Sequence, residues 1–188
     1  MRQDRAFRLY LLGISLLGMF FAFIVTFRYG AGLATDGARY LSTAENLING
    51  KGFTEYLGVP LTQFPPLYSI IVAGIGWITR ADVFAVSQYL NILTFGLTIW
   101  LAGRFFRKLF PDNVLYAYIG SGIFVTSVSL LRMASNILSD LLFLALTIAF
   151  LIAATDFMRD PSRKNGLVLG GLCAISPLLR YAGLAHIL

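Results

Sequence analysis

Residues 66–79 read "PLYSIIVAGIGWIT", and whether this stretch crosses a membrane decides the fold of the chain. The stretch carries no charge, but its 14 residues form a helix of only about 21 Å. The hydrocarbon core of a bilayer is about 30 Å thick. Pro65 and Pro66 suit the start of a helix, and Tyr68 and Trp77 suit the depth of the lipid headgroups. We therefore predict a helix that lies in the membrane interface.

The composition indicates a membrane protein with several helices. Of its 188 residues, 57% are hydrophobic and 13% are charged, whereas a soluble domain carries about 25% charged residues. The single cysteine, Cys173, excludes an intrachain disulfide. Apolar stretches long enough to span a bilayer occupy residues 9–27, 84–103, 113–131, 139–158 and 166–188. These stretches predict an all-α, polytopic helical bundle.

The basic residues report the topology of this bundle. Nine of the 15 lysines and arginines form three clusters beside apolar stretches: Arg2, Arg5 and Arg8; Arg104, Arg107 and Lys108; and Arg159, Arg163 and Lys164. If 66–79 crossed the membrane, the second and third clusters would lie outside; otherwise all three lie in the cytoplasm, as the positive-inside rule favours. We therefore predict about five transmembrane helices in the cell membrane and a cytoplasmic N-terminus. This clustering also argues against a nucleic-acid partner, despite the net charge of +6.

The chain is predicted to form one transmembrane domain over residues 1–188, with an outer loop at 28–83 that holds two interfacial helices. Besides 66–79, residues 36–49 place apolar side chains on one face, at helical spacing: Tyr40, Leu41, Ala44, Leu47 and Ile48. Asp36 suits the N-cap of this helix, and Gly50 suits the position just past its end. Such an amphipathic helix lies along the membrane surface.

Both ends of the chain allow a second interpretation. Residues 2–8 followed by 9–27 could be a secretory signal peptide, but about 19 apolar residues exceed the usual 7–15 of such a peptide. We favour an uncleaved first helix, because further spans follow it. The sequence stops inside the apolar stretch 166–188, which favours the N-terminal part of a longer protein.

Four ionisable side chains are predicted at the outer side of the membrane. Asp36 follows the first span, Arg132 ends the third, Asp140 opens the fourth, and Arg180 lies about 15 residues into the last. Ionisable groups inside spans usually face a cavity and a partner. The carboxylates suit activation of a hydroxyl or binding of a cation, and the arginines suit a phosphate. A substrate with a phosphate head and a lipid tail would fit such a cavity.

Each of the four side chains also has a purely structural explanation. Asp36 can cap a helix, and Asp140 can favour a helix start through its charge. Arg132 can mark a membrane boundary, and Arg180 can extend its side chain to the surface.

Several motifs, in order, resemble one known family. "DGARY" (36–40) resembles a "DEARY" signature, and "NGKGF" (49–53) a glycine-containing stop that follows it. "FPPLYSIIVAGIGWI" (64–78) resembles an interfacial helix, and "SNILSDLLFLALTIAF" (135–150) and "SPLLRYAGL" (176–184) resemble two later spans. Together they resemble lipid-linked-sugar glycosyltransferases of the GT-C fold, above all the family-39 and aminoarabinose-transferase-like branch.

This resemblance implies an enzyme that moves a sugar from a polyprenyl-phosphate carrier to an acceptor lipid, glycan or protein outside the cytoplasm. Under it, Asp36 is the catalytic acid that activates the acceptor, with Arg39 beside it. Asp140 is the second acid, and Arg180 holds the carrier phosphate. The resemblance leaves a divalent metal open and requires no other cofactor. It also implies that the chain is the N-terminal catalytic part of a longer enzyme.

The sequence departs from the family pattern at two positions. Gly37 stands where the signature has a second acid, which weakens any metal-binding version of the site. Phe64 stands where part of the family has a lysine before the Pro-Pro pair, which puts an aminoarabinose acceptor in doubt.

Two other kinds of protein remain as alternatives. A transporter fragment predicts discontinuous helices near the midplane and an internal repeat, and the sequence shows no repeat. A non-enzymatic membrane scaffold predicts that Asp36 points to bulk solvent, away from Asp140.

Overall fold

The computed structural model describes residues 2–187, with side chains from Arg5 onward. Met1 and Leu188, at the two ends of the predicted domain, lie outside the described residues, as does the side chain of Arg2. The elements are α1 (Arg2–Tyr29), α2 (Thr35–Ile48), α3 (Leu67–Thr79), α4 (Val83–Leu109), α5 (Val114–Thr126), α6 (Val128–Ser135), α7 (Asp140–Arg159), α8 (Arg163–Leu179) and the 3-10 helix η1 (Tyr181–His186). The described residues form isolated β-bridges but no strand, so the all-α class is confirmed.

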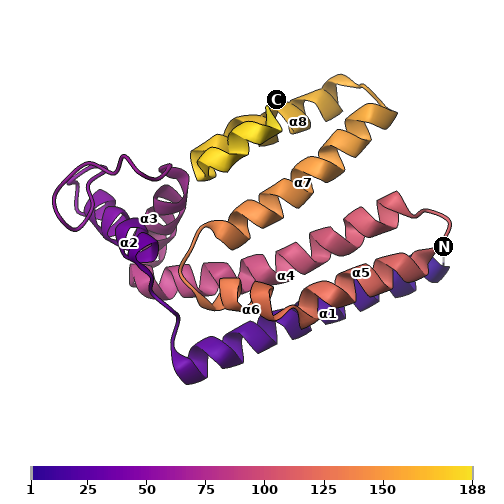
Figure 1. Ribbon diagram of the computed structural model, residues 1–188, viewed down its shortest axis with the longest axis horizontal. Helices are drawn as coiled ribbons and strands as arrows, with labels where there is room; N and C mark the ends of the chain where they lie inside the picture. The colour runs from indigo at the N-terminus through magenta and orange to yellow at the C-terminus, as the bar shows by residue number, and fades with distance from the viewer. Residues whose placement is uncertain (1, 188) are drawn as a thin grey trace.

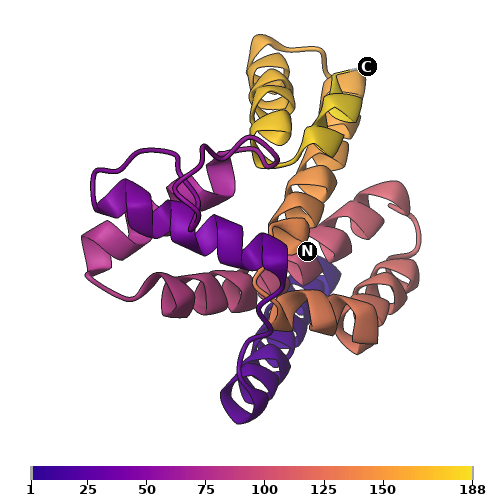
Figure 2. The same cartoon turned by 60° about the vertical axis from the view of Figure 1, so that its left-hand side comes forward.

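The helices place the connections at two opposite ends of the molecule. α2 and α3 lie together where α1 ends and α4 begins (Figures 1 and 2). We call this the loop end and define it by residues 30–82, 136–139 and 180–182. The start of α1 and the α4–α5 and α7–α8 connections lie opposite, as Figure 1 shows. We call this the basic end and define it by residues 5–8, 104–113 and 156–164.

Three helices are long and apolar enough to cross a membrane: Arg5–Tyr29, Val83–Leu109 and Asp140–Arg159. α5 and α6 are bent by 52° relative to each other and make a fourth candidate span only as a broken pair. The stretch predicted as one helix over 113–131 is therefore two helices, and the hydroxyl of Ser127 caps the second. α3 has only 13 residues and falls short of a span. The described residues thus hold three or four candidate spans.

The last predicted helix, 166–188, does not continue to the end of the chain. α8 stops at Leu179, and Arg180 has an extended backbone, with φ −150° and ψ 142°. η1 then folds back onto α8, and a Cβ added to Gly183 would collide with the backbone of Ser176. Glycine at this position allows the two segments to approach. Arg180 therefore lies at the end of a helix, and its prediction within a continuous span was wrong.

α1 belongs to the folded core, because it packs closely along α4. A Cβ added to Gly96 would collide with the side chain of Met19, and one added to Gly103 would collide with Leu11. Leu11 is buried. Small residues that let helix backbones approach are typical of helix pairs in membranes, where van der Waals packing drives association.

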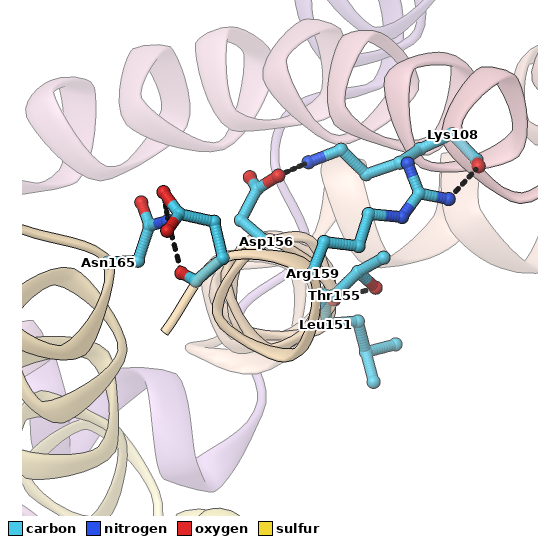
Figure 3. Close-up of polar contacts among 7 residues, drawn as sticks. Lys108, Leu151, Thr155, Asp156, Arg159 and Asn165 are labelled. Carbon is cyan, nitrogen blue, oxygen red and sulfur yellow. Dashed lines mark hydrogen bonds and ion pairs between the residues drawn. The ribbon is translucent and has the colours of Figure 1, made fainter. Parts of the chain in front are cut away.

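The interactions at the basic end join α4 to α7. Lys108 forms an ion pair with Asp156, and Arg159 Nη2 donates to the carbonyl oxygen of Lys108 at 3.1 Å (Figure 3). Arg8, near the start of α1, lines a cavity together with Arg104 of α4. The three basic clusters of the sequence therefore gather at one end of the molecule, as the predicted topology requires.

α2 forms close to its predicted position and ends as predicted. Tyr40, Leu41 and Ala44 are buried, whereas Ile48 at the end of the predicted face is exposed. The N–H of Lys51 donates to the carbonyl of Asn46 at 2.8 Å, and the N–H of Gly50 donates to that of Leu47 at 3.2 Å. These two bonds form a Schellman motif, with Gly50 at φ +71°.

Candidate active site

A cavity of about 190 Å³ opens at the loop end. Four segments that are distant in the sequence meet there: the start of α2, the loop before α3, the α6–α7 connection with the start of α7, and the turn after α8. The lining residues are Asp36, Tyr40, Gln63, Phe64, Pro65, Leu138, Asp140, Arg180, Tyr181 and Ala182. The structure therefore brings three of the predicted site residues, Asp36, Asp140 and Arg180, to one cavity.

A backbone link between two connections places Asp36 beside Asp140. The N–H of Gly32 donates to the carbonyl of Ser135 at 2.8 Å, and the N–H of Ile137 donates to the carbonyl of Gly32 at 2.9 Å. These bonds fasten the α1–α2 connection to the α6–α7 connection. The two acids follow these linked segments by only a few residues, so the link fixes their separation.

Gly37 lies where α2 passes very close to the α6–α7 connection. A Cβ added to Gly37 would collide with the carbonyl oxygen of Ile137. α2 therefore rests directly on the α6–α7 connection, and no side chain fits between them. The sequence interpretation treated Gly37 as a lost metal ligand, whereas the structure gives it a packing role.

Asp36 does not cap α2, so that prediction was wrong. The N-cap is Ala34, which offers no side-chain cap, and Asp36 lies in the first helical turn. Its carboxylate is exposed and lines the cavity. Within the described part of the chain it makes no hydrogen bond or ion pair, so it is available to a ligand.

Asp140 and Arg180 form an ion pair inside the cavity. Arg180 Nη1 lies 2.7 Å from Asp140 Oδ2 and 3.5 Å from the hydroxyl of Ser139. The two side chains are 34% and 36% exposed, so the pair contributes little to stability. A guanidinium has five N–H donors, and the pair leaves several of them for an anion.

Tyr40 brings a hydroxyl to the cavity, although the sequence analysis placed this residue only on the apolar face of α2. Its hydroxyl lies 3.2 Å from the hydroxyl of Ser139, and its ring is buried. Burial raises the pKa of Tyr40 and outweighs the hydrogen bond with Ser139 and the charge of Arg180, which lower it. The hydroxyl therefore stays neutral at physiological pH. Tyr40 follows Asp36 by four residues, a helical spacing that could have placed both side chains on one side.

Arg39 does not line the cavity, in contrast to its predicted role beside the substrate. Its Nε lies 3.1 Å from Glu55 Oε2 without the geometry of a hydrogen bond, so the contact is ionic. It also donates to Gln63 Oε1, and its guanidinium lies 6.0 Å from the ring centre of Phe64. Arg39 therefore holds the loop that carries three lining residues, Gln63, Phe64 and Pro65.

Arg132 lies in the last turn of α6 with an exposed side chain, and it is not among the lining residues. The structure gives it no place in this site.

Gln63 and Tyr181 were missed by the sequence interpretation, and both line the cavity. The hydroxyl of Tyr181 donates to the carbonyl of Thr62 at 3.2 Å, which joins the turn after α8 to the loop before α3. The only sequence signal was the position of Tyr181 next to Arg180.

An apolar slot of about 240 Å³ lies between α3, α4, α7 and α8. Its lining is entirely aliphatic: Leu67, Ile71, Leu97, Leu101, Leu142, Ala145, Leu146, Ala149, Ile175 and Leu179. Leu179 directly precedes Arg180, Leu142 follows Asp140 by two residues, and Leu67 follows the lining residue Pro65 by two. Residues of the charged cavity and residues of the aliphatic slot are therefore neighbours in the sequence at the start of α7 and at the end of α8.

Few side chains in the cavity could bind a metal ion. No group of three or more His, Cys, Asp or Glu side chains lies within reach of one ion in the described part of the chain. The cavity supplies Asp36 and Asp140, and the second is paired with Arg180. Mg²⁺ and Ca²⁺ take six or more oxygen ligands, so most would have to come from water or substrate.

No protein-family model, curated protein or solved structure matches this chain. The resemblance to GT-C glycosyltransferases therefore rests on the quoted sequence motifs alone.

Proposed function

We propose that the protein is an integral-membrane glycosyltransferase that moves a sugar from a polyprenyl-phosphate carrier to an extracytoplasmic acceptor. The observation that carries this proposal is the cavity shared by Asp36, Asp140 and Arg180, with an aliphatic slot lined by their neighbours in the sequence. A phosphate head and a hydrocarbon tail need these two environments side by side.

The proposed transfer uses each charged side chain once. An acceptor hydroxyl attacks the anomeric carbon of the sugar while the bond from that carbon to the carrier phosphate breaks. The carboxylate of Asp36, which has no partner among the described residues, takes the acceptor proton. The departing phosphate keeps the bonding electrons, and Arg180 stabilises its charge. Asp140 holds the guanidinium in place at 2.7 Å.

The proposed topology has five membrane passes, made by α1, α4, the bent α5–α6 pair, α7 and α8, with α2 and α3 in the interface. The basic end then lies in the cytoplasm and the cavity at the outer surface. The gathering of the three basic clusters at one end supports this orientation. The 17 residues of α8 reach about 25 Å, and the chain turns back at Arg180.

The test is the Asp36→Asn variant, expressed from its complete reading frame and assayed with polyprenyl-phosphate sugars. Loss of the proton acceptor should lower the transfer rate by about 10²-fold or more. Glu45→Gln is the matched control, since Glu45 is an exposed acid on the same helix and does not line the cavity. Transfer at the wild-type rate in Asp36→Asn would contradict the proposal.

A further inference from the structure

A second cavity, of about 520 Å³, opens at the basic end between the start of α1 and the last turns of α4. Four cationic side chains surround an aromatic and aliphatic floor, and the lining residues are Phe7, Arg8, Leu11, Trp100, Arg104, Arg107 and Lys108. It lies at the other end of the bundle from the candidate active site and shares no residue with it.

The four cations are not equivalent. Lys108 is paired with Asp156, and Arg107 Nη1 donates to the carbonyl of Pro111 at 2.6 Å. Arg8 and Arg104 come from different helices and have exposed side chains. Cations held around one space repel each other, and an anion between Arg8 and Arg104 would relieve that repulsion.

The spacing along α4 relates the cavity to the membrane. Trp100 precedes Arg104 by four residues, so the two lie on the same side of the helix, with the indole about 6 Å nearer the bilayer centre. Tryptophan prefers the boundary between lipid headgroups and acyl chains. The guanidinium of Arg104 therefore lies at headgroup depth.

We propose that this cavity binds the headgroup phosphate of an anionic membrane phospholipid. Arg8 and Arg104 bind the phosphate oxygens, and Trp100 packs against the glycerol and the first acyl carbons. The lipid bridges α1 and α4 at the ends where both helices leave the membrane. The inference requires only that these helices span the bilayer and is independent of the sugar-transfer proposal.

The same end of the molecule supplies a matched control. Arg163 and Lys164 are exposed cations at the start of α8, and neither lines the cavity. Arg163→Gln/Lys164→Gln removes the same charge as Arg8→Gln/Arg104→Gln. The comparison separates a defined site from general attraction to a charged surface.

The experiment uses the purified full chain in nanodiscs of phosphatidylcholine, alone or mixed with phosphatidylglycerol. Native mass spectrometry measures retained phosphatidylglycerol, and melting in phosphatidylcholine alone checks that each variant is folded. Arg8→Gln/Arg104→Gln should weaken phosphatidylglycerol retention about tenfold or more, whereas the control pair should retain it. Equal loss in both pairs, or no loss in either, would overturn the site. Full displacement of the lipid by soluble glycerol phosphate would overturn the assignment to a lipid.

A second measurement leaves every residue that lines the cavity unsubstituted. The chain has two tryptophans, and Trp77 lies at the loop end, so Trp77→Phe leaves Trp100 as the only tryptophan, whose fluorescence is excited selectively over that of tyrosine. Phosphatidylglycerol with brominated acyl chains should quench Trp100 more strongly than brominated phosphatidylcholine at the same mole fraction. Equal quenching by the two lipids would contradict selective binding of the anionic one.

Discussion

The two ends of the molecule use charge in different ways. At the loop end, a cavity of about 190 Å³ mixes signs, with Asp140 paired to Arg180 and Asp36 left without a partner among the described residues. At the basic end, a cavity of about 520 Å³ is lined by four cations. A site that moves a proton and stabilises a leaving anion needs both signs at short range, whereas a site that only holds an anion needs one.

The largest effect is expected where a single charge is removed from the loop-end cavity. Arg180→Gln should lower sugar transfer by about 10²-fold or more, because it removes donors aimed at the departing phosphate. Arg163→Gln removes the same charge at the basic end, outside both cavities, and should transfer sugar at the wild-type rate. Assays of the two purified variants with a polyprenyl-phosphate sugar make the comparison. Equal slowing of transfer in both variants would contradict a specific role for Arg180, because loss of a positive charge at either end would then have the same effect.

A smaller effect is expected from separating α2 from the α6–α7 connection. Gly37→Ala should destabilise the protein by about 1–3 kcal/mol, because its Cβ would collide with the carbonyl oxygen of Ile137. Gly74→Ala is the control, since an added Cβ there meets nothing within 4 Å and alanine favours a helix. Thermal melting in detergent measures both. A melting temperature for Gly37→Ala at or above that of the control would contradict the close contact.

The smallest effect concerns buried hydroxyls at the loop end. Burial raises the pKa of Tyr68 to about 12 from the ordinary 10.0. The unfolded chain therefore loses its proton first, and this tyrosine makes stability fall as the pH rises from about 10 to about 12. Tyr68→Phe should flatten that fall, and Tyr89→Phe, at an exposed position, should not. Melting temperatures across this pH range provide the measurement, and parallel curves for Tyr68→Phe and wild type would refute the prediction.

Sequence reasoning found Asp140 and Arg180 because charge is costly in an apolar stretch and therefore conspicuous, and it found Asp36 through the motif DGARY that follows the first span. It placed Arg39 beside the substrate because the motif DGARY resembles a signature with an arginine near the acid, whereas in the structure Arg39 contacts Glu55 and Gln63. Its partner Glu55 lies in a loop with no periodic pattern, so nothing in the sequence indicated the ion pair. Tyr40 was missed because an aromatic ring at helical spacing predicts burial and gives no sign of where its hydroxyl lies.

The sequence by itself determined the helical class, the three longest candidate spans and the gathering of the basic clusters at one end of the molecule. These properties depend on hydropathy, length and charge, which are local along the chain. Only the tertiary structure decided that α8 ends at Leu179, that Arg39 pairs with Glu55, and that Gly32 joins the segment before Asp140. The bonds of Gly32 join segments about a hundred residues apart, Arg39 reaches Glu55 in a loop without a periodic pattern, and α8 ends where the chain folds back. No local pattern encodes any of these contacts.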